Sequence, residues 1–274
     1  METQGSLTVV GTGISISGQM TLLTESVIKN ADIVLAVVTQ SALFNLKKLN
    51  ANTVCLRQYY DVNTSRLISY QKMQQHIVQE VLSGKRVVAA FYGHPGVFVV
   101  PSHEAITELR HLGFKAEMLP GVSAEDCLVA DLGLDPSRFG CQSYEATQFV
   151  FRRYTIDPHM MQIIWQIGSI AYFNEAKNKT KHPGLIVLRD ALLKVYPPEH
   201  RVIIYEAATI PIVPPRIDEI ILKNLSDVVP SGISTLVVPA LGLPEYDIET
   251  MAKFGLTPEL FKQKLVQNNQ ITEC

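Results

Sequence analysis

Short apolar runs rich in β-branched residues alternate with segments of helical spacing over the first 120 residues. The runs predict strands at Leu7–Val10, Ile33–Val38, Val87–Phe91 and Lys115–Leu119. Between them, the spacing predicts helices over about 20–30, 65–83 and 102–112. Strands that alternate with helices in this way are typical of a parallel sheet.

The predicted helix that follows Ser65 has clear end signals. Ser65 is a favourable N-cap residue, and Gly84 is a favourable residue after the last turn. Its apolar positions follow helical spacing and are Leu67, Tyr70, Met73, Ile77 and Val81. Tyr70 is therefore either a core residue or, if the helix borders a site, a candidate for chemistry.

The second half of the chain has more closely spaced strand signals. They lie at Cys141–Tyr144, Gln162–Ile167, Arg201–Tyr205, Ile217–Leu222 and Ser234–Pro239, with helices at about 124–131 and 184–195. Strands without a helix between each pair favour a mixed sheet. We therefore expect an N-terminal α/β domain over 1–120, a second α/β domain over 121–242 and a helical extension over 243–274. A cleft between two such domains is a natural place for a cofactor.

The composition narrows the possible functions. The chain has 274 residues, 47% of them hydrophobic and 18% charged, and its net charge is −2 without a basic run, so no nucleic-acid partner is expected. It has no apolar run long enough for a membrane span and no secretion signal at its start, so a cytoplasmic location is expected. Its four cysteines have no metal-ligand spacing, so buried thiols and no metal site are expected.

Two glycine-rich turns follow predicted strands. In the first, Gly11 and Gly13 are followed by Gly18, which is too late for a dinucleotide-binding fingerprint, and Asp32 precedes the second strand. The second turn, residues 92–98, reads Tyr-Gly-His-Pro-Gly-Val-Phe. Its glycines allow a close backbone approach to a ligand, although an ordinary strand-to-helix turn has the same composition.

Several segments together resemble the tetrapyrrole methylase superfamily. They are residues 10–13, 92–98, 119–124, 205–208 and 234–236. Within that superfamily, Gln58-Tyr59-Tyr60-Asp61, Ser65-Arg66-Leu67 and Tyr70 are most similar to the borosin-type peptide backbone α-N-methyltransferases. The resemblance covers roughly residues 5–240. It implies two α/β domains with S-adenosylmethionine between them, and a homodimer whose subunits are interlocked.

The resemblance also implies a set of cofactor-binding residues. They are Tyr92, His94 and Val97 on the methionine and ribose side, Ser123 and Ala124 at the carboxylate end, and Gln166, Ala207, Ser234 and Thr235 around the adenine and its ribose. Ser123 is equally well explained as the N-cap of the helix that follows it. Both roles are compatible, because a helix N-terminus also favours a carboxylate.

Methylation of a backbone amide needs help from nearby side chains, because the lone pair of the nitrogen is delocalised into the carbonyl. A base at the N–H and a donor or cation at the carbonyl oxygen favour the imidate form. Arg66 and Tyr70 are four residues apart on one predicted helix and share a face, so Arg66 is expected to favour a tyrosine phenolate. The phenolate would take the amide proton, while Arg66 or a protonated Tyr92 stabilises the oxygen. The resemblance implies Arg66, Tyr70 and Tyr92 as the central catalytic residues and Tyr60 as a supporting one.

Other residues carry weaker signals. Relatives often have a tyrosine at the position of Arg57, so an additional cation here could alter the grip on the substrate. We expect Tyr59 and Trp165 to be packing residues, Trp165 in the core or between domains. His94 is expected to bond a ligand or a loop carbonyl, and Glu206 either flanks the cofactor or orients loop backbone.

The substrate is inferred from the family resemblance. Fused relatives end in an apolar core peptide, whereas the segment 256–274 is charged and glutamine-rich. We therefore expect a ribosomally made precursor peptide supplied in trans as the substrate. Two alternatives stay open, namely methylation of a tetrapyrrole or other small molecule and a catalytically idle protein that binds a peptide.

Overall fold

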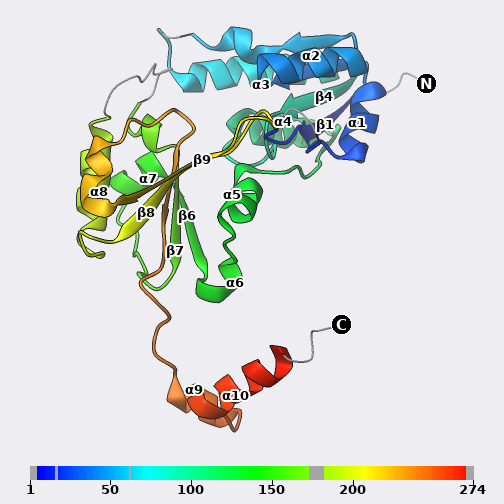
Figure 1. Ribbon diagram of the computed structural model, residues 1–274. Helices are drawn as coiled ribbons and strands as arrows, with labels where there is room; N and C mark the ends of the chain where they lie inside the picture. Colours follow the sequence, from blue (N-terminus) through cyan, green and yellow to red (C-terminus); the bar gives the residue numbers. More distant parts are fainter. Residues whose placement is uncertain (1–4, 16–17, 62, 173–181, 270–274) are drawn as a thin grey trace.

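The computed structural model describes residues 5–15, 18–61, 63–172 and 182–269. Two α/β units lie one above the other, and a helical arm extends from the lower unit (Figure 1). The expected fold, a parallel sheet followed by a mixed sheet, is confirmed.

The upper unit is built on five parallel strands. They are β1 (Ser6–Gly11), β2 (Ile33–Val37), β3 (Thr53–Cys55), β4 (Arg86–Phe91) and β5 (Lys115–Met118), in the spatial order β3-β2-β4-β1-β5. Strand β3 and the helix before it were not predicted from the sequence.

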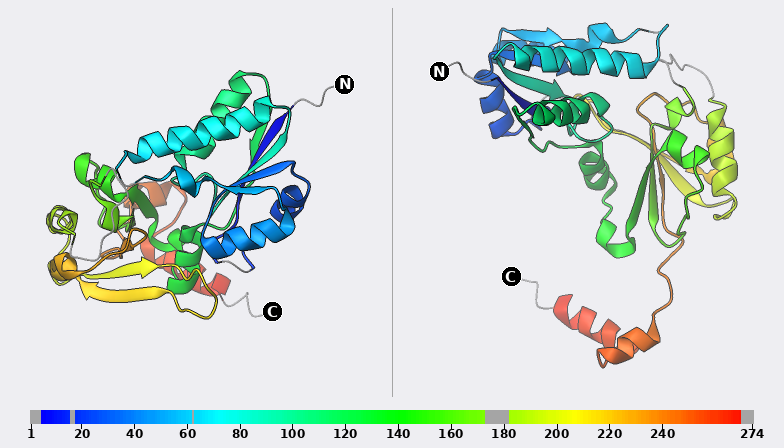
Figure 2. Two further views of the ribbon diagram at one scale, coloured as in Figure 1. Left: turned by 90° about the horizontal axis from the view of Figure 1, so that it is seen from above. Right: turned by 180° about the vertical axis from the view of Figure 1, so that it is seen from behind.

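Helices cover both faces of this sheet. Helices α1 (Leu22–Lys29) and α2 (Gln40–Leu49) pack on one face, and α3 (Arg66–Leu82) and α4 (Val100–His111) pack on the other. Figure 2 (left) shows α3 and α2 on opposite sides of the strands. Because side chains alternate along a strand, Val9 packs toward α3 and α4 while Val10 packs toward α1 and α2. This two-sided burial explains the continuous apolar runs in the sequence.

The lower unit is built on a mixed sheet. Its strands are β6 (Cys141–Glu145), β7 (Met161–Trp165), β8 (Arg201–Glu206), β9 (Arg216–Ile221) and β10 (Thr235–Val238), in the order β6-β7-β10-β8-β9. Only the β6–β7 pair among these neighbours is parallel. The predicted strand 162–167 ends at Trp165, because Gln166 adopts a left-handed conformation (φ 60°) and a 3₁₀ turn, η2 (Ile167–Ser169), follows.

Helices again cover both faces of the mixed sheet. Helices α7 (Ala146–Phe151) and α8 (Gly184–Leu192) and the 3₁₀ helix η3 (Leu222–Asp227) pack on one face. Helix α5 (Ala124–Leu132) packs on the other and leads to the short α6 (Pro136–Phe139). Figure 1 shows α5 between the parallel sheet above it and strands β6 and β7 beside it. The chain thus passes from one unit to the other through the start of α5.

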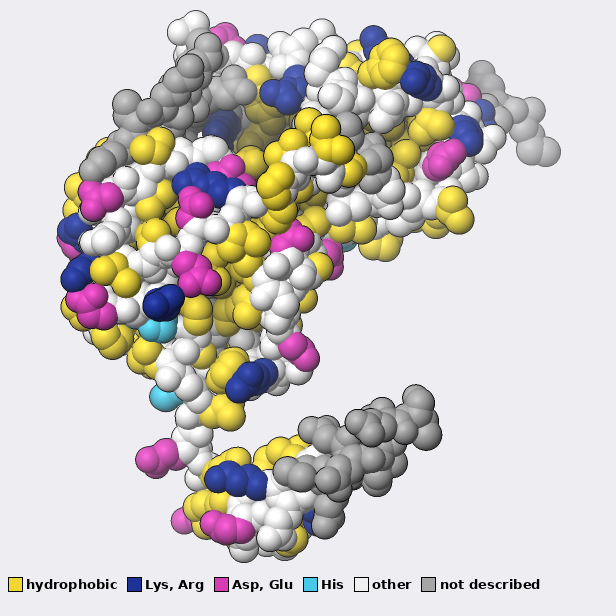
Figure 3. Space-filling view, viewed as in Figure 1, with side chains coloured by type: hydrophobic (Ala, Val, Ile, Leu, Met, Phe, Trp, Pro, Cys, Tyr) yellow, Lys and Arg dark blue, Asp and Glu magenta, His cyan; other side chains and the backbone are white. Residues whose placement is uncertain are grey.

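The C-terminal arm stands apart from both units. It contains α9 (Ile248–Lys253) and α10 (Pro258–Asn269), which Gly255 separates with a left-handed φ of 65°. Figure 3 shows hydrophobic side chains on the surface of this arm. One of its hydrophobic residues, Phe254, is 76% exposed. The helical tail predicted from the sequence is therefore present but broken, and its last five residues, 270–274, lie outside the described part of the chain. Within the described part, no helix is both long and apolar enough to cross a membrane.

The parallel sheet has a topological switch point between its neighbouring strands β1 and β4. The chain leaves β1 through α1 toward β2 on one side, and it leaves β4 through α4 toward β5 on the other. Ligands of open α/β sheets bind in the crevice at the carboxyl ends of such strands. Residues 11–13 and 92–98, the two glycine-rich turns of the sequence, follow these two ends.

The turns at this crevice leave no room for a side chain at Gly11. A Cβ atom there would lie 2.2 Å from the Gly93 carbonyl oxygen and 2.9 Å from the Pro95 Cδ atom. We expect Gly11→Ala to lower the free energy of unfolding by about 1–3 kcal/mol, because backbone must move to make room. Thermal denaturation measures this loss. Gly232→Ala is the matched control, since its Cβ would meet nothing closer than the Ser169 Oγ atom at 3.9 Å. Equal melting temperatures for the two variants would contradict the prediction.

Candidate functional site

Three turns meet at the carboxyl ends of the parallel strands. The Gly93 N–H donates to the Gly13 carbonyl oxygen (2.8 Å), which joins the turns after β1 and β4. The turn after β5 approaches equally closely, because a Cβ on Gly121 would lie 3.0 Å from the Gly11 Cα atom. Backbone therefore forms the floor of the crevice, and the side chains of residues 92–98 and 123–124 are placed at its edge.

Two arginines and three tyrosines gather beside this crevice, and we refer to them as the tyrosine–arginine group. Its members are Arg57, Tyr60, Arg66, Tyr70 and Tyr92. They come from the 3₁₀ helix η1 (Leu56–Tyr59) and the residue after it, from the first two turns of α3, and from the residue after β4. The rings of Tyr60 and Tyr70 meet edge to face, with centroids 6.3 Å apart.

Helix α3 begins where the sequence predicts, and this start determines where Arg66 and Tyr70 lie. Ser65 caps α3 by accepting a hydrogen bond from the Leu67 N–H (3.2 Å), as predicted. Arg66 is therefore the first residue of the helix, and Tyr70 lies about one turn further along the same face. Tyr59 lies outside the group, because its hydroxyl bonds to the Nδ1 atom of His76 (2.9 Å), in line with the packing role expected for it.

The phenols of Tyr60 and Tyr92 are held in their neutral form. Burial raises the pKa of Tyr60 well above its ordinary value of 10.0, and the neighbouring Tyr70 raises it further, whereas Arg66 and Arg57 lower it too little to reverse the shift. The pKa of Tyr92 is raised by the same causes, although its side chain is 46% exposed at the edge of the crevice. Arg66 therefore lowers the pKa of these two tyrosines, in the expected direction, but loss of water outweighs the attraction of the cations.

The turn at residues 92–98 connects the two units. Phe98, which has a left-handed φ of 56°, places its ring 6.2 Å from the ring of Trp165 at the end of β7. Trp165 is 5% exposed, so the packing role predicted for it is confirmed. His94 accepts a hydrogen bond from the Gly96 N–H at its Nδ1 atom (3.0 Å), where the sequence suggested a ligand or a loop carbonyl. In the neutral ring the proton is then on Nε2.

Ser123 begins α5 with a complete capping box. Its Oγ atom accepts from the backbone N–H groups of Glu125 and Asp126, both at 3.2 Å, and the Asp126 carboxylate accepts from the Ser123 N–H (2.6 Å) and hydroxyl (2.7 Å). Burial raises the pKa of Asp126, but these bonds and the nearby His94 bring it below its ordinary value. The N-cap role of Ser123 is confirmed, and the Asp126 carboxylate that it binds is close enough to His94 to interact electrostatically.

The remaining predicted cofactor residues meet at one end of the mixed sheet. Gln166 follows β7, Ala207 follows β8, and Ser234 and Thr235 lie at the start of the antiparallel β10. The Ile167 N–H donates to the Ser234 carbonyl oxygen (2.9 Å), which joins the ends of β7 and β10. Because Phe98 contacts Trp165 beside Gln166, this end faces the turn at residues 92–98.

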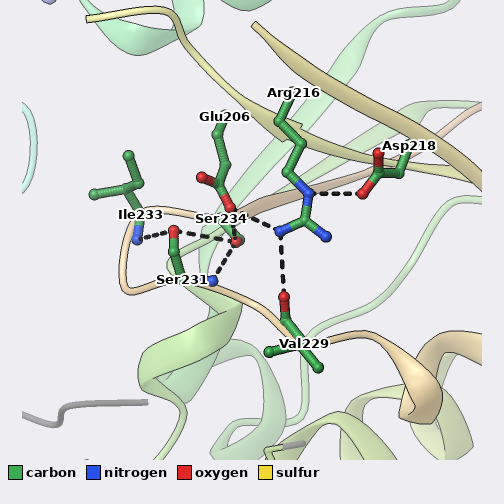
Figure 4. Close-up of polar contacts among 7 residues, drawn as sticks. All are labelled: Glu206, Arg216, Asp218, Val229, Ser231, Ile233 and Ser234. Carbon is green, nitrogen blue, oxygen red and sulfur yellow. Dashed lines mark hydrogen bonds and ion pairs between the residues drawn. The ribbon is translucent and has the colours of Figure 1, made fainter. Parts of the chain in front are cut away.

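A half-buried polar network, shown in Figure 4, holds the start of β10. The Ser234 hydroxyl donates to the Glu206 carboxylate, which also pairs with Arg216 (3.0 Å). Arg216 in turn pairs with Asp218 (2.6 Å) and donates to the Val229 carbonyl oxygen (3.2 Å). Sequence reasoning missed Arg216, because only the pairing of β8 with β9 brings it opposite Glu206.

The cysteines and acidic residues do not form a metal centre in the described part of the chain. No group of three or more histidine, cysteine, aspartate or glutamate side chains is arranged there to hold an ion. Cys55, Cys127 and Cys141 carry free thiols and are half-buried, which corrects the expectation of full burial, and Cys274 lies outside the described residues.

Comparison with known families gives one match over most of the chain. Residues 6–219 match the family described as Tetrapyrrole (Corrin/Porphyrin) Methylases. Among solved structures, uroporphyrin-III-C-methyltransferase from Thermus thermophilus superposes with a TM-score of 0.60 at 20% identity, covering 89% of this chain and 99% of that one. Diphthine synthase superposes with a TM-score of 0.62 at 15% identity, covering 87% of this chain and 91% of that one. At these identities the superpositions show the fold alone.

Curated relatives are more similar in sequence. The chain is 42% identical over 262 residues to a methyltransferase/ribosomally synthesized cyclic peptide omphalotin A precursor from Omphalotus olearius, covering 93% of this chain and 62% of the relative. It is 42% identical over 265 residues to the corresponding lentinulin A precursor from Lentinula edodes, with the same coverage. It is 41% identical over 264 residues to a type III borosin cyclic peptide precursor from Anomoporia bombycina, covering 94% of this chain and 30% of that relative. The chain thus spans less than two thirds of the length of each of these relatives.

The raised pKa of Tyr60 can be measured by titration. We expect Tyr60→Phe to remove a tyrosinate absorbance step whose midpoint lies above pH 10.0, because burial outweighs the two arginines. The phenol is protonated and neutral below that midpoint, so the step is absent at neutral pH. Tyr59→Phe controls for the loss of one tyrosine outside the group. If the absorbance step that disappears in Tyr60→Phe is centred at or below pH 10.0, the two arginines affect the pKa of Tyr60 more than burial does, which would contradict the prediction.

Proposed function

The chain belongs to the tetrapyrrole methylase family, and we propose that it is an S-adenosylmethionine-dependent methyltransferase that methylates backbone amide nitrogens of a peptide. The observation that carries this proposal is the tyrosine–arginine group beside the crevice at the switch point. Several phenols and two guanidinium groups around one opening suit an amide that must lose a proton while its oxygen gains charge. The names of the curated relatives, which join a methyltransferase to a cyclic peptide precursor, support the same substrate class.

The residues at the crevice fit S-adenosylmethionine. The close packing of the turns at Gly11, Gly93 and Gly121 presents backbone along the crevice, where a ligand can approach closely. Tyr92, His94 and Val97 would hold the methionine and ribose side, with Ser123 and Ala124 near the carboxylate. Because Asp126 already takes both donors of Ser123, the proposed carboxylate contact relies on the first turn of α5 around Ala124. Gln166, Ala207, Ser234 and Thr235 would hold the adenine and its ribose.

In the proposed reaction, side chains of the protein accept the amide proton and stabilise the charge that develops on the carbonyl oxygen. Bound S-adenosylmethionine supplies a methyl group on a positively charged sulfur. We assign Tyr70, as a phenolate, to accept the amide proton, which passes on to solvent. The amide nitrogen forms the new N–C bond while the C–S bond breaks and its electron pair stays on sulfur. Tyr92, whose raised pKa keeps its phenol protonated, donates to the carbonyl oxygen, and Arg66 stabilises the charge that develops there.

A second copy of this chain is the proposed partner of the helical arm. The arm stands apart from both units in Figure 3 and exposes Ile248, Phe254 and Leu265. Exposed apolar residues on a projecting element favour association with another surface. A homodimer would cover them, and the peptide would be presented to the crevice as a separate molecule in trans.

The proposal is tested by methyl transfer to a separate peptide. The purified chain is incubated with S-adenosylmethionine and acetyl-Gly-Val-Ile-Val-Val-Gly-amide, and fragmentation mass spectrometry locates any added methyl group. Methylation of backbone nitrogen is expected. Methylation of uroporphyrinogen, with no peptide product, would replace the proposal by the tetrapyrrole alternative. Cofactor binding without transfer to any acceptor would favour an idle binding protein.

Variants at Arg66 and Tyr70 test whether these residues act in methyl transfer or in cofactor binding. We expect Tyr70→Phe to lower the rate of methyl transfer about 10²–10⁴-fold, because a general base is lost. Arg66→Ala is expected to lower it about 10²–10³-fold, because oxyanion stabilisation is lost. Cofactor binding, measured by calorimetry, stays unchanged in both variants. Tyr59→Phe is the matched control and keeps full activity. Full activity of Tyr70→Phe would remove the phenolate mechanism, and loss of cofactor binding in Arg66→Ala would make Arg66 a structural residue.

The network at Glu206 is expected to support cofactor binding. Glu206→Ala leaves the buried Ser234 hydroxyl and the half-buried Arg216 without their shared acceptor, which frees the start of β10. Loss of a buried partner costs about 1–3 kcal/mol, so we expect cofactor affinity to fall roughly tenfold. Glu219→Ala is the matched control on the same strand pair, because its ion pair with Arg201 is exposed. Calorimetry compares the two, and equal affinities would contradict the prediction.

A further inference from the structure

A pocket lies at the switch point on the sheet face that carries α1 and α2. Its walls are the turn after β1, which contributes Thr12 and Ile14, and one face of α2, which contributes Ala42 and Leu46. Tyr92 lines it as well. The pocket is open to solvent, and its empty volume, mouth included, is about 530 Å³. None of the other residues assigned above to the cofactor or to catalysis is among its described lining residues.

The described lining of the pocket suits an uncharged, apolar occupant. None of these lining residues carries a charge, and Ile14, Met20, Ala42 and Leu46 supply apolar surface. The hydroxyl of Thr39 is engaged as the N-cap of α2, where it accepts from the Ala42 N–H (3.3 Å). Thr12 donates its hydroxyl proton to the Phe91 carbonyl oxygen at the end of β4 (3.3 Å). These two hydroxyls are therefore engaged with backbone, and none of the described lining residues offers a charge to pair with a charged occupant.

The wall formed by the turn after β1 is held firmly. The Gln19 side-chain oxygen accepts from the N–H groups of Ile14 (2.8 Å) and Ser15 (2.7 Å). The Gln19 amide group donates to the Sγ atom of Cys127 on α5 (3.4 Å). These bonds fix the backbone at Ile14 against α5, which favours a pocket of fixed shape.

Tyr92 places the pocket next to the proposed chemistry. Its backbone N–H donates to the Val37 carbonyl oxygen at the end of β2 (3.2 Å), and its phenol is close enough to Arg57, Arg66 and Tyr70 to interact electrostatically. The same residue lines the pocket. Tyr92 is thus shared by the pocket and the tyrosine–arginine group.

We propose that this pocket receives the side chain of the residue whose backbone nitrogen is methylated, and that it selects aliphatic side chains. The inference rests on the proposed function, because it takes a peptide as substrate. The part of the pocket that the centre of a water-sized molecule can reach is only about 90 Å³. This is small beside the roughly 300–1,000 Å³ of sites for whole small ligands, so one amino-acid side chain is the fitting occupant.

The test varies one residue of a peptide and one residue of the pocket. Peptides acetyl-Gly-Val-X-Val-Gly-amide, with X as alanine, valine, leucine, phenylalanine or lysine, are methylated in competition, and products at the nitrogen of X are counted by fragmentation. The wild-type chain is expected to prefer valine and leucine to lysine by at least about tenfold. Ala42→Phe, which fills the pocket, should shift the preference from leucine to alanine by about tenfold. Met20→Ala, which enlarges it, should raise the relative rate with phenylalanine.

Control variants and measurements distinguish a misfolded variant from failure of the pocket proposal and from failure of the proposed function. Ser41→Phe places the same ring on an exposed position of α2 outside the described lining and should keep the wild-type preference. The melting temperature establishes that each variant is folded, and calorimetry measures its cofactor binding separately. Unchanged preference in folded Ala42→Phe and Met20→Ala would overturn the pocket proposal alone. Loss of cofactor binding in folded Ala42→Phe would assign the pocket to the cofactor and overturn it too. Absence of transfer to any peptide by the wild-type chain would overturn the proposed function, and this inference with it.

Discussion

The close backbone approach of three turns is the constraint on which the rest of this structure depends. Residues 11–13, 92–96 and 119–121 follow neighbouring parallel strands, and they pack so tightly that side chains are excluded at Gly11 and Gly121. This packing sets the positions of Tyr92 and His94 on one side of the crevice and of Ser123, at the start of α5, on the other. Since α5 leads into the mixed sheet, the same contact also sets where the second unit begins.

The tyrosine–arginine group balances two opposing effects. Burial favours neutral phenols, whereas the guanidinium groups of Arg57 and Arg66 favour phenolates. Among the described residues, neither arginine forms an ion pair with a carboxylate. Their charge is therefore available to a substrate oxygen. The neutral phenols of Tyr60 and Tyr92 beside these cations suit a negative charge that develops on a substrate oxygen during a reaction.

The sequence predicted the parts of the structure that depend on local pattern. Continuous apolar runs located the parallel strands other than β3. Ser65 and Ser123 located two helix starts, because capping is a local interaction. Helix α2 was missed although its buried residues Leu43 and Leu46 have helical spacing, and β3 has only three residues. The pairing of Arg216 with Glu206 and the dominance of burial at Tyr60 were not predictable, since both depend on which distant segments pack together.

The ring contact between Phe98 and Trp165 joins the two units at the crevice, and Trp165 is the single tryptophan of the chain. It directly precedes Gln166, whose left-handed backbone ends β7 at the proposed adenine site. Every change in the separation of the two units at this point alters the surroundings of one indole ring. The fluorescence of Trp165 therefore reports the opening of the crevice in the unlabelled chain.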